Sequence, residues 1–273
     1  MDAPGISEHG TDRDRRLARK LERSPGAFFI ERGRDLTLAA PYFNQRLAEG
    51  AYSGAAKRHL HNLCAATYAV LLSSFELTWK ALFAHIIDRT TSYDKRLLDW
   101  NKTSVSVESL LAHRDQTSVG AMFASTFGAW QQPDLVNDRY ERLLELRPFS
   151  NQDVTTLTDL WQLRHVIAHS SGIMGGLDAY RVSWDLPVDS ALQLDPQFVE
   201  QSYAELRGIV AARVADIGTK LLDDFFSGAA TGDWASDRET FSALYLLGHV
   251  VGQRQELPEV DEVEYQQQRL AHQ

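Results

Sequence analysis

The sequence predicts an all-α fold, and three observations support this prediction. Helix-forming residues recur nearly everywhere in the 273 residues, hydrophobic side chains repeat at helical spacing, and strand signals are scarce. With 44% hydrophobic and 10% aromatic residues, the chain can bury one large core or two modest ones. We therefore expect a helical bundle with N- and C-terminal helical extensions and at most one short β-hairpin.

The first helical patterns follow a variable opening segment. One covers about 36–48, and a long one covers about 54–88, where a single apolar stripe should pack on other helices. Shorter helices are expected at 106–114, 118–131 and 134–146, because polar or proline-containing turns separate these segments.

The next predicted helix spans 151–169. Ser150 lies three residues before Asp153, which is a helix-start signal. The helix should stop at Ser170-Ser171-Gly172, because glycine can take the left-handed conformation after a helix C-terminus.

Residues 179–185 carry the strand signal, since Tyr180, Val182 and Trp184 alternate to one side. Their expected partner lies near 191–194.

The end of the chain is predicted to hold two more helices. Asp195-Pro196 combines an N-cap with a proline at the first helical position, and that helix should continue to Phe226. A break at 228–232 precedes a last helix at 236–252, and the polar tail after it is expected to be disordered. We divide the chain into a basic helical extension at 1–53, a helical core at 54–226 and a C-terminal helix with its tail at 227–273.

Charge and composition restrict the function. The net charge of −9 argues against a protein that coats nucleic acid by bulk electrostatics, although it permits a local phosphate site. We interpret the basic segment 13–23 as a solvated helix or a mobile arm. The single Cys64 and the lack of a signal-peptide pattern indicate a cytoplasmic protein. The most apolar stretch, 63–75, falls short of the roughly 20 residues of a membrane span, so no membrane association is expected.

The helix at 151–169 carries the candidate chemistry. At 100° per residue, one face is apolar and must be the core face, formed by Leu160, Leu163, Val166 and Ile167. His165 and His169 fall on the far side, Trp161 continues their stripe, and Arg164 lies at the boundary. His169 in the last turn favours the protonated imidazole, which can move protons, and Arg164 can hold a phosphate with two hydrogen bonds. One chain supplies no second proton carrier to this pair.

The segment LRHVIAHSSG at 163–172 resembles the signature of the HEPN superfamily: an arginine, a polar residue, three more residues and a histidine at a helix end. The matching residues are Arg164, His165 and His169. The layout is also similar, because a long earlier helix contains Ser-Ser-Phe-Glu at 73–76 and a long helix follows the motif. The resemblance covers about 54–226.

This resemblance implies a metal-independent endoribonuclease without a cofactor, acting as a homodimer whose two motifs form one site. One His169 would deprotonate the ribose 2′-hydroxyl and the other would protonate the leaving 5′-oxygen. Arg164 would stabilise the phosphate, His165 would orient the pair or bind RNA, and Glu76 would lie near the site. Many such proteins are toxins or antiviral effectors, so an antitoxin or a defence-system protein is a possible partner.

Several alternatives remain open at this stage. The chain could be a non-catalytic HEPN module that binds RNA, a nucleotide or a protein through Trp161 and the segment 13–23, or it could be a structural scaffold. Trp161 fits a packing or dimer-interface residue better than a base-stacking platform. His165 and His169 have the one-turn spacing of metal ligands, but no third ligand is close in sequence, so we expect no metal. Glu76 and Lys80 could simply form an exposed ion pair.

Overall fold

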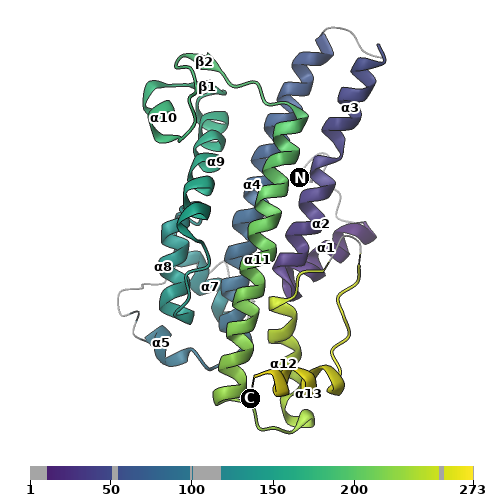
Figure 1. The fold of residues 1–273 in the computed structure, drawn as a ribbon, viewed down its shortest axis with the longest axis vertical. Coiled ribbons are helices and arrows are strands. Elements are labelled where there is room, and N and C mark those ends of the chain that lie inside the picture. Colours follow the sequence, from purple (N-terminus) through teal and green to yellow (C-terminus); the bar gives the residue numbers. More distant parts are fainter. Residues whose placement is uncertain (1–10, 51–54, 99, 101–117, 252–254, 273) are drawn as a thin grey trace, which may run out of the picture.

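The computed structural model describes residues 11–50, 55–98, 100, 118–251 and 255–272. These residues form an all-α bundle with one two-stranded sheet, as predicted. Figure 1 labels the elements, which are α1 (Asp12–Arg23), α2 (Pro25–Thr37), α3 (Ala39–Ala48), α4 (Ala55–Arg89), α5 (Asp94–Leu98), α7 (Val119–Thr126), α8 (Pro133–Leu144), α9 (Asn151–His169), β1 (Ile173–Met174), α10 (Gly176–Arg181), β2 (Ser190–Ala191), α11 (Pro196–Gly228), α12 (Trp234–Gly248) and α13 (Glu262–Ala271).

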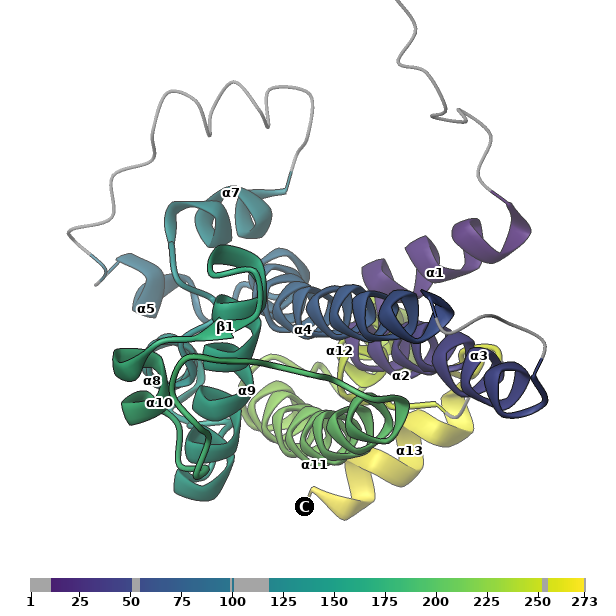
Figure 2. The ribbon, with the colours of Figure 1, turned by 90° about the horizontal axis from the view of Figure 1, so that it is seen from above.

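The two longest helices, α4 and α11, run side by side through the centre of the bundle (Figures 1 and 2). α8 and α9 lie on one side of this pair, and α2 and α3 lie on the other. α4 supplies several of the largest fully buried side chains, among them Tyr68, Trp79 and Phe83. The motif helix α9 is thereby held against a rigid central helix.

The predicted helices agree with the structure where local signals are strong. The long helix at 54–88, the motif helix and the helix after Asp195 are confirmed. The helix predicted at 36–48 is present as α3, which starts three residues later. α2 was not predicted, although Ser24 caps it and Pro25 is its first residue. The helices predicted at 118–131 and 236–252 are shorter, and 106–114 lies outside the described residues.

The basic segment 13–23 is a largely exposed helix, one of our two interpretations, and not a mobile arm. It forms α1, which packs on α2, and Lys20 is only 2% exposed. The Lys20 ammonium donates to the Glu31 carboxylate at 2.7 Å, and Arg16 donates to the same carboxylate. Arg13 pairs with Asp35 at 2.7 Å. Much of the positive charge of this segment therefore holds the N-terminal helices together.

The strand prediction at 179–185 is wrong. The short antiparallel hairpin pairs Ile173 with Ala191 and Met174 with Ser190, and residues 176–181 form α10 instead. The following chain is fixed by a side chain of α9, because Asp159 accepts a hydrogen bond from the Ser183 backbone at 2.8 Å and another from its hydroxyl. Residues 179–185 are thus the end of α10 and a stretch tethered to α9, and not a strand.

Disorder of the polar tail is also wrong over α13. Asp261 caps this helix, and Tyr265 is completely buried. The Tyr265 hydroxyl donates to Asp237 at 2.7 Å, and the same carboxylate accepts bonds from Thr231 and Gly232. The buried Asp237 of α12 is therefore hydrogen-bonded both to the loop before α12 and to the C-terminal helix α13.

The apolar part of α4 is longer than expected. Over His59–Arg89 it is long and apolar enough to cross a membrane by length and composition, whereas the stretch 63–75 was expected to be too short. In the structure 61% of the apolar window is buried inside the protein, as in the core helix of a bundle. Cytoplasmic localisation stays a prediction.

α11 and α12 approach closely at two glycines, which leads to the first testable prediction. A Cβ added to Gly218 would lie 2.5 Å from the Cα of Gly248, so alanine there forces the helices apart. We expect Gly218→Ala to lower the free energy of unfolding by about 1–3 kcal/mol, as overpacking does.

Gly208 provides the matched control in the same helix, because nothing lies within 4 Å of its added Cβ. Gly208→Ala should raise stability by about 0.5–1 kcal/mol through helix propensity. Denaturant unfolding measures the free energy of unfolding of both variants. An equal change in the two variants would contradict the close approach of α11 and α12.

Candidate functional site

The start of the motif helix is firmly fixed. Ser150 caps α9 by accepting from the Asp153 backbone, and the Asp153 side chain accepts from the Ser150 backbone at 2.9 Å, which completes the predicted capping box. Arg213 of α11 also pairs with Asp153 at 2.8 Å. Asp153 therefore both caps α9 and ties it to the central helix α11.

The end of the motif helix also agrees with the prediction. α9 ends at His169, and Ser171 and Gly172 adopt φ angles of +53° and +79°. The Ser170 and Gly172 amides both donate to the Val166 carbonyl, at 2.9 and 3.1 Å. His169 thus occupies the last turn of α9.

The two histidines lie on the exposed face of α9, as predicted. The centres of the His165 and His169 rings are 4.7 Å apart, and both side chains are exposed. The opposite face enters the core, because Leu160, Leu163 and Val166 are at most 2% exposed.

Gln162 precedes His165 by three residues and belongs to the same stripe, since positions three and seven apart share a helix face. Gln162 was not among the predicted site residues, although its spacing from His165 and His169 places it on their helix face.

Trp161 does not continue the exposed stripe. It is 8% exposed and belongs to the hydrophobic core, so its placement on the solvent face is corrected, and the packing interpretation fits. An indole side chain is large enough to reach from the edge of the exposed face of α9 into the core, where other side chains cover it. The Arg164 guanidinium carbon lies 5.7 Å from the centre of the Trp161 ring, a cation–π contact. Trp161 therefore supports Arg164 and presents little surface of its own.

Arg164 is half-buried, and its Nε atom is buried with no hydrogen-bond acceptor among the described residues. A buried guanidinium nitrogen without an acceptor is costly, so it is a natural donor to an added anion or to water. Arg164 also lies close to Glu76 of α4. Burial raises the pKa of Glu76, and the charges of Arg164 and Lys80 lower it, with a net rise.

Glu76 is thus on the face of α4 that lies near Arg164. Within the described chain, no ion pair of 4.0 Å or less joins Glu76 to Lys80 or to Arg164, so the simple surface salt bridge is not formed. Glu76 acts on Arg164 at longer range.

The raised pKa of Glu76 gives a pH-dependent prediction. Because its folded-state pKa exceeds the unfolded value, Glu76 favours folding when protonated, and this contribution is lost as the pH rises through the folded-state pKa. We expect Glu76→Gln to unfold at a higher temperature than the wild type at neutral pH. The difference should shrink in acid.

Thermal unfolding at several pH values measures this effect. Glu141→Gln on the exposed face of α8 serves as the control, because replacing an exposed carboxylate changes stability little. A gap between Glu76→Gln and wild type that is constant with pH would contradict the burial of this carboxyl.

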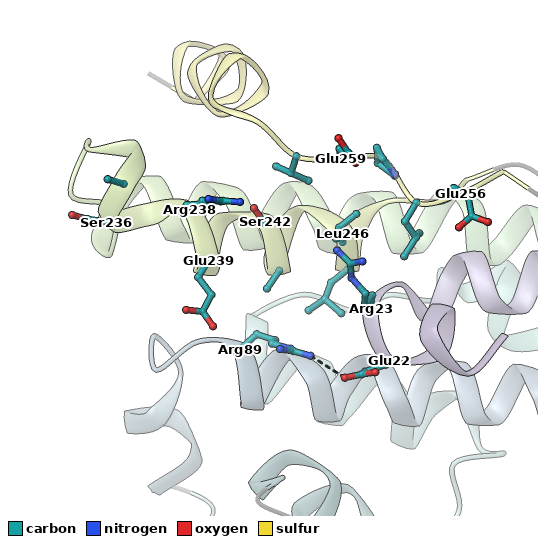
Figure 3. A pocket seen from close by; sticks show the side chains of 16 residues that line it. Glu22, Arg23, Arg89, Ser236, Arg238, Glu239, Ser242, Leu246, Glu256 and Glu259 are labelled. Carbon is teal, nitrogen blue, oxygen red and sulfur yellow. Dashed lines mark ion pairs between the residues drawn. The ribbon is translucent and has the colours of Figure 1, made fainter. Parts of the chain in front are cut away.

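Two grooves of the described structure lie away from the motif. One of about 1130 Å³ is bordered by α1, α4, α12 and the segment 256–260, where Arg89 and Glu22 are 3.9 Å apart (Figure 3). The other, of about 500 Å³, lies beside the start of α11. Neither is lined by Arg164, His165 or His169.

The described residues contain no group of three His, Cys, Asp or Glu side chains that could hold a metal ion. The site therefore consists of an exposed imidazole pair, a cation with an unpartnered buried nitrogen and a nearby carboxyl. This set can bind a phosphate and transfer a proton. No family model matches the sequence, and no curated protein and no solved structure is significantly similar to it.

Proposed function

We propose that this protein is a metal-independent endoribonuclease whose active site forms between two copies of the chain. The observation that supports it most is the end of α9, where His165 and His169 are exposed side by side and Arg164 keeps a buried donor without an acceptor. The resemblance of 163–172 to the HEPN signature supports the same reaction.

In this proposal each group has a role that follows from its chemistry. His169 of one copy accepts the proton of a ribose 2′-hydroxyl, which attacks the adjacent phosphorus. His169 of the other copy donates a proton to the leaving 5′-oxygen. Arg164 hydrogen-bonds the phosphate oxygens and opposes their added charge, and Trp161 and Glu76 limit where the guanidinium can move. His165 orients His169 or contacts the RNA.

A second copy has a suitable surface to bind. Beside Glu76, α4 exposes an uncharged stripe that includes Ala66, Val70, Ser73 and Leu77, with Val70 41% and Leu77 40% exposed. Small side chains at a contact allow the axes of two packed helices to lie close together. Contact along this stripe would bring two α9 helices near each other, because α9 packs on α4.

The alternative of a non-catalytic RNA-binding module receives less support. It depended on Trp161 and the segment 13–23, but Trp161 is buried and Arg16 and Lys20 are engaged by Glu31. A role as a toxin or antiviral effector, with an antitoxin or defence-system partner, rests on the resemblance alone and remains part of the proposal.

The decisive experiment is an RNA cleavage assay in the presence of a chelator. We expect purified wild-type protein to cut RNA there and to leave a 2′,3′-cyclic phosphate and a 5′-hydroxyl, because a 2′-hydroxyl attack gives these ends. RNA in which every 2′-hydroxyl is methylated is the matched control and should remain intact. Cleavage that disappears with the chelator, or products with a 5′-phosphate, would reject this mechanism.

A further inference from the structure

α10 is held beside the histidine stripe by a specific contact. The Gln162 side-chain amide donates to the Asp178 carboxylate at 2.7 Å, and both groups are partly buried. Gln162 is on the exposed stripe of α9, one helical turn before His165. This contact places the short helix after the motif on the same side of α9 as the two imidazoles, at one end of the bundle (Figure 1).

α10 presents an exposed aromatic side chain at this place. Tyr180 is 89% exposed, more than any other exposed large hydrophobic residue of the described chain, and Leu177 is 75% exposed. Arg181 next to Tyr180 is also exposed. Trp184, by contrast, packs on Phe198 with ring centres 6.2 Å apart. Tyr180 therefore has a ring face that the fold does not use.

The charge of the protein indicates what this ring face can do. At a net charge of −9, general attraction to phosphates is weak, so RNA at the α9 site needs another source of affinity. Stacking of a base on an aromatic ring is independent of net charge, and an adjacent arginine can contact the neighbouring phosphate. A single-stranded RNA satisfies both contacts, because its bases are not paired.

We propose that Tyr180 is a stacking platform for an unpaired base of single-stranded RNA next to the scissile phosphate, with Arg181 beside it. The Gln162–Asp178 hydrogen bond positions the platform relative to His165 and His169. This inference rests on the proposed function, since it names how the substrate of that same site is held.

The test is binding of a single-stranded 2′-O-methyl RNA that carries 2-aminopurine, whose fluorescence falls when the base stacks. The wild type should bind it and quench it. Tyr180→Ala should bind roughly tenfold more weakly, the order of one lost stacking contact, and lose the quenching, while Tyr180→Phe keeps both. Tyr42→Ala on α3 is the matched control, because Tyr42 is also exposed but lies at another part of the bundle (Figure 1).

Two outcomes overturn the platform. Equal affinity and quenching for Tyr180→Ala and wild type would do so. So would a loss of dimer in analytical ultracentrifugation for Tyr180→Ala and Leu177→Ala alike, because the patch would then bind a second copy. Tyr180→Ala should keep the wild-type circular dichroism, since so exposed a side chain adds little to the core.

Cleavage of unmodified RNA separates this inference from the proposed function. A wild type that binds and quenches but does not cut would reject the nuclease and support the platform. A wild type that cuts, with an unchanged KM in Tyr180→Ala, would reject the platform alone. A wild type that neither binds nor cuts would reject both.

Discussion

Replacing His169 with alanine should reduce RNA cleavage by a factor of about 10³ or more while the protein stays folded. A positioned acid or base contributes about 10²–10⁴, and in the proposed dimer one substitution removes both the base and the acid. His169 is exposed, so its loss leaves the core unchanged. Initial cleavage rates at equal protein concentration, with thermal unfolding as the check on folding, measure the effect.

Arg164→Ala should reduce cleavage by about 10²–10³, as the loss of one donor to a developing charge does. His59→Ala is the matched control, because His59 is an exposed histidine of α4 outside the motif, and it should cut at the wild-type rate. Unchanged cleavage in both His169→Ala and Arg164→Ala would remove the site assignment.

Mixing active and inactive subunits tests whether the site is composite. If two chains share one site, equal amounts of wild type and His169→Ala, allowed to exchange subunits, should leave about one quarter of the dimers fully active. Independent sites would instead retain about half of the activity. The cleavage rate of the exchanged sample, divided by the rate of wild type at the same total protein concentration, gives the active fraction.

The largest expected effect on stability comes from the buried pair of α1 and α2. Lys20→Ala should lower the free energy of unfolding by about 3–5 kcal/mol, because it leaves the Glu31 carboxylate buried with one partner fewer. Lys20 and Glu31 are each 2% exposed, and Lys20 also donates to the Gln255 carbonyl at 2.7 Å. Chemical denaturation followed by circular dichroism measures the loss.

Two variants show what causes that loss. Arg13→Ala removes an exposed ion pair with Asp35 and should cost less than about 1 kcal/mol. Replacing Lys20 with Met and Glu31 with Leu together should restore much of the stability, since neither charge is then left alone. A double variant as unstable as Lys20→Ala would show that side-chain packing, and not the unpaired charge, is responsible.

The same pair makes stability depend on pH. Burial raises the pKa of Glu31, but hydrogen bonds from Lys20 and Arg16 outweigh this, so its pKa lies below its usual range. A lowered acid pKa stabilises the fold above the unfolded-state value, and this contribution is lost as the pH falls through the folded-state value. Wild type should therefore lose stability in acid, and the Met/Leu double variant should lose less.

Local signals were enough to predict the helix that carries the motif. Ser150 and Asp153 form reciprocal hydrogen bonds within one turn, and Gly172 supplies a left-handed residue shortly after His169. Residues close in sequence therefore determine both ends of α9. Its core face followed from the spacing of Leu160, Leu163 and Val166. The exposure of His165 and His169 followed from the same geometry.

The features that were mispredicted depend on partners far away in sequence. Nothing near Tyr265 indicates that Asp237 will accept its hydroxyl, so the tail appeared disordered. Asp159 holds Ser183 from another element, which the alternation at 179–185 cannot show. The proximity of Glu76 to Arg164 came only from the resemblance, because the two residues are far apart in the sequence.

The double attachment of Asp153 has a mechanical consequence for the chemistry at the other end of its helix. α9 is a rod of about 27 Å from Asn151 to His169, at 1.5 Å per residue. Over that length, a tilt of about 2° at the base moves the tip by about 1 Å, and an error of that size can cost a rate factor of about 10². The position of His169 therefore depends on the opposite end of its own helix, where Arg213 and Ser150 hold one carboxylate.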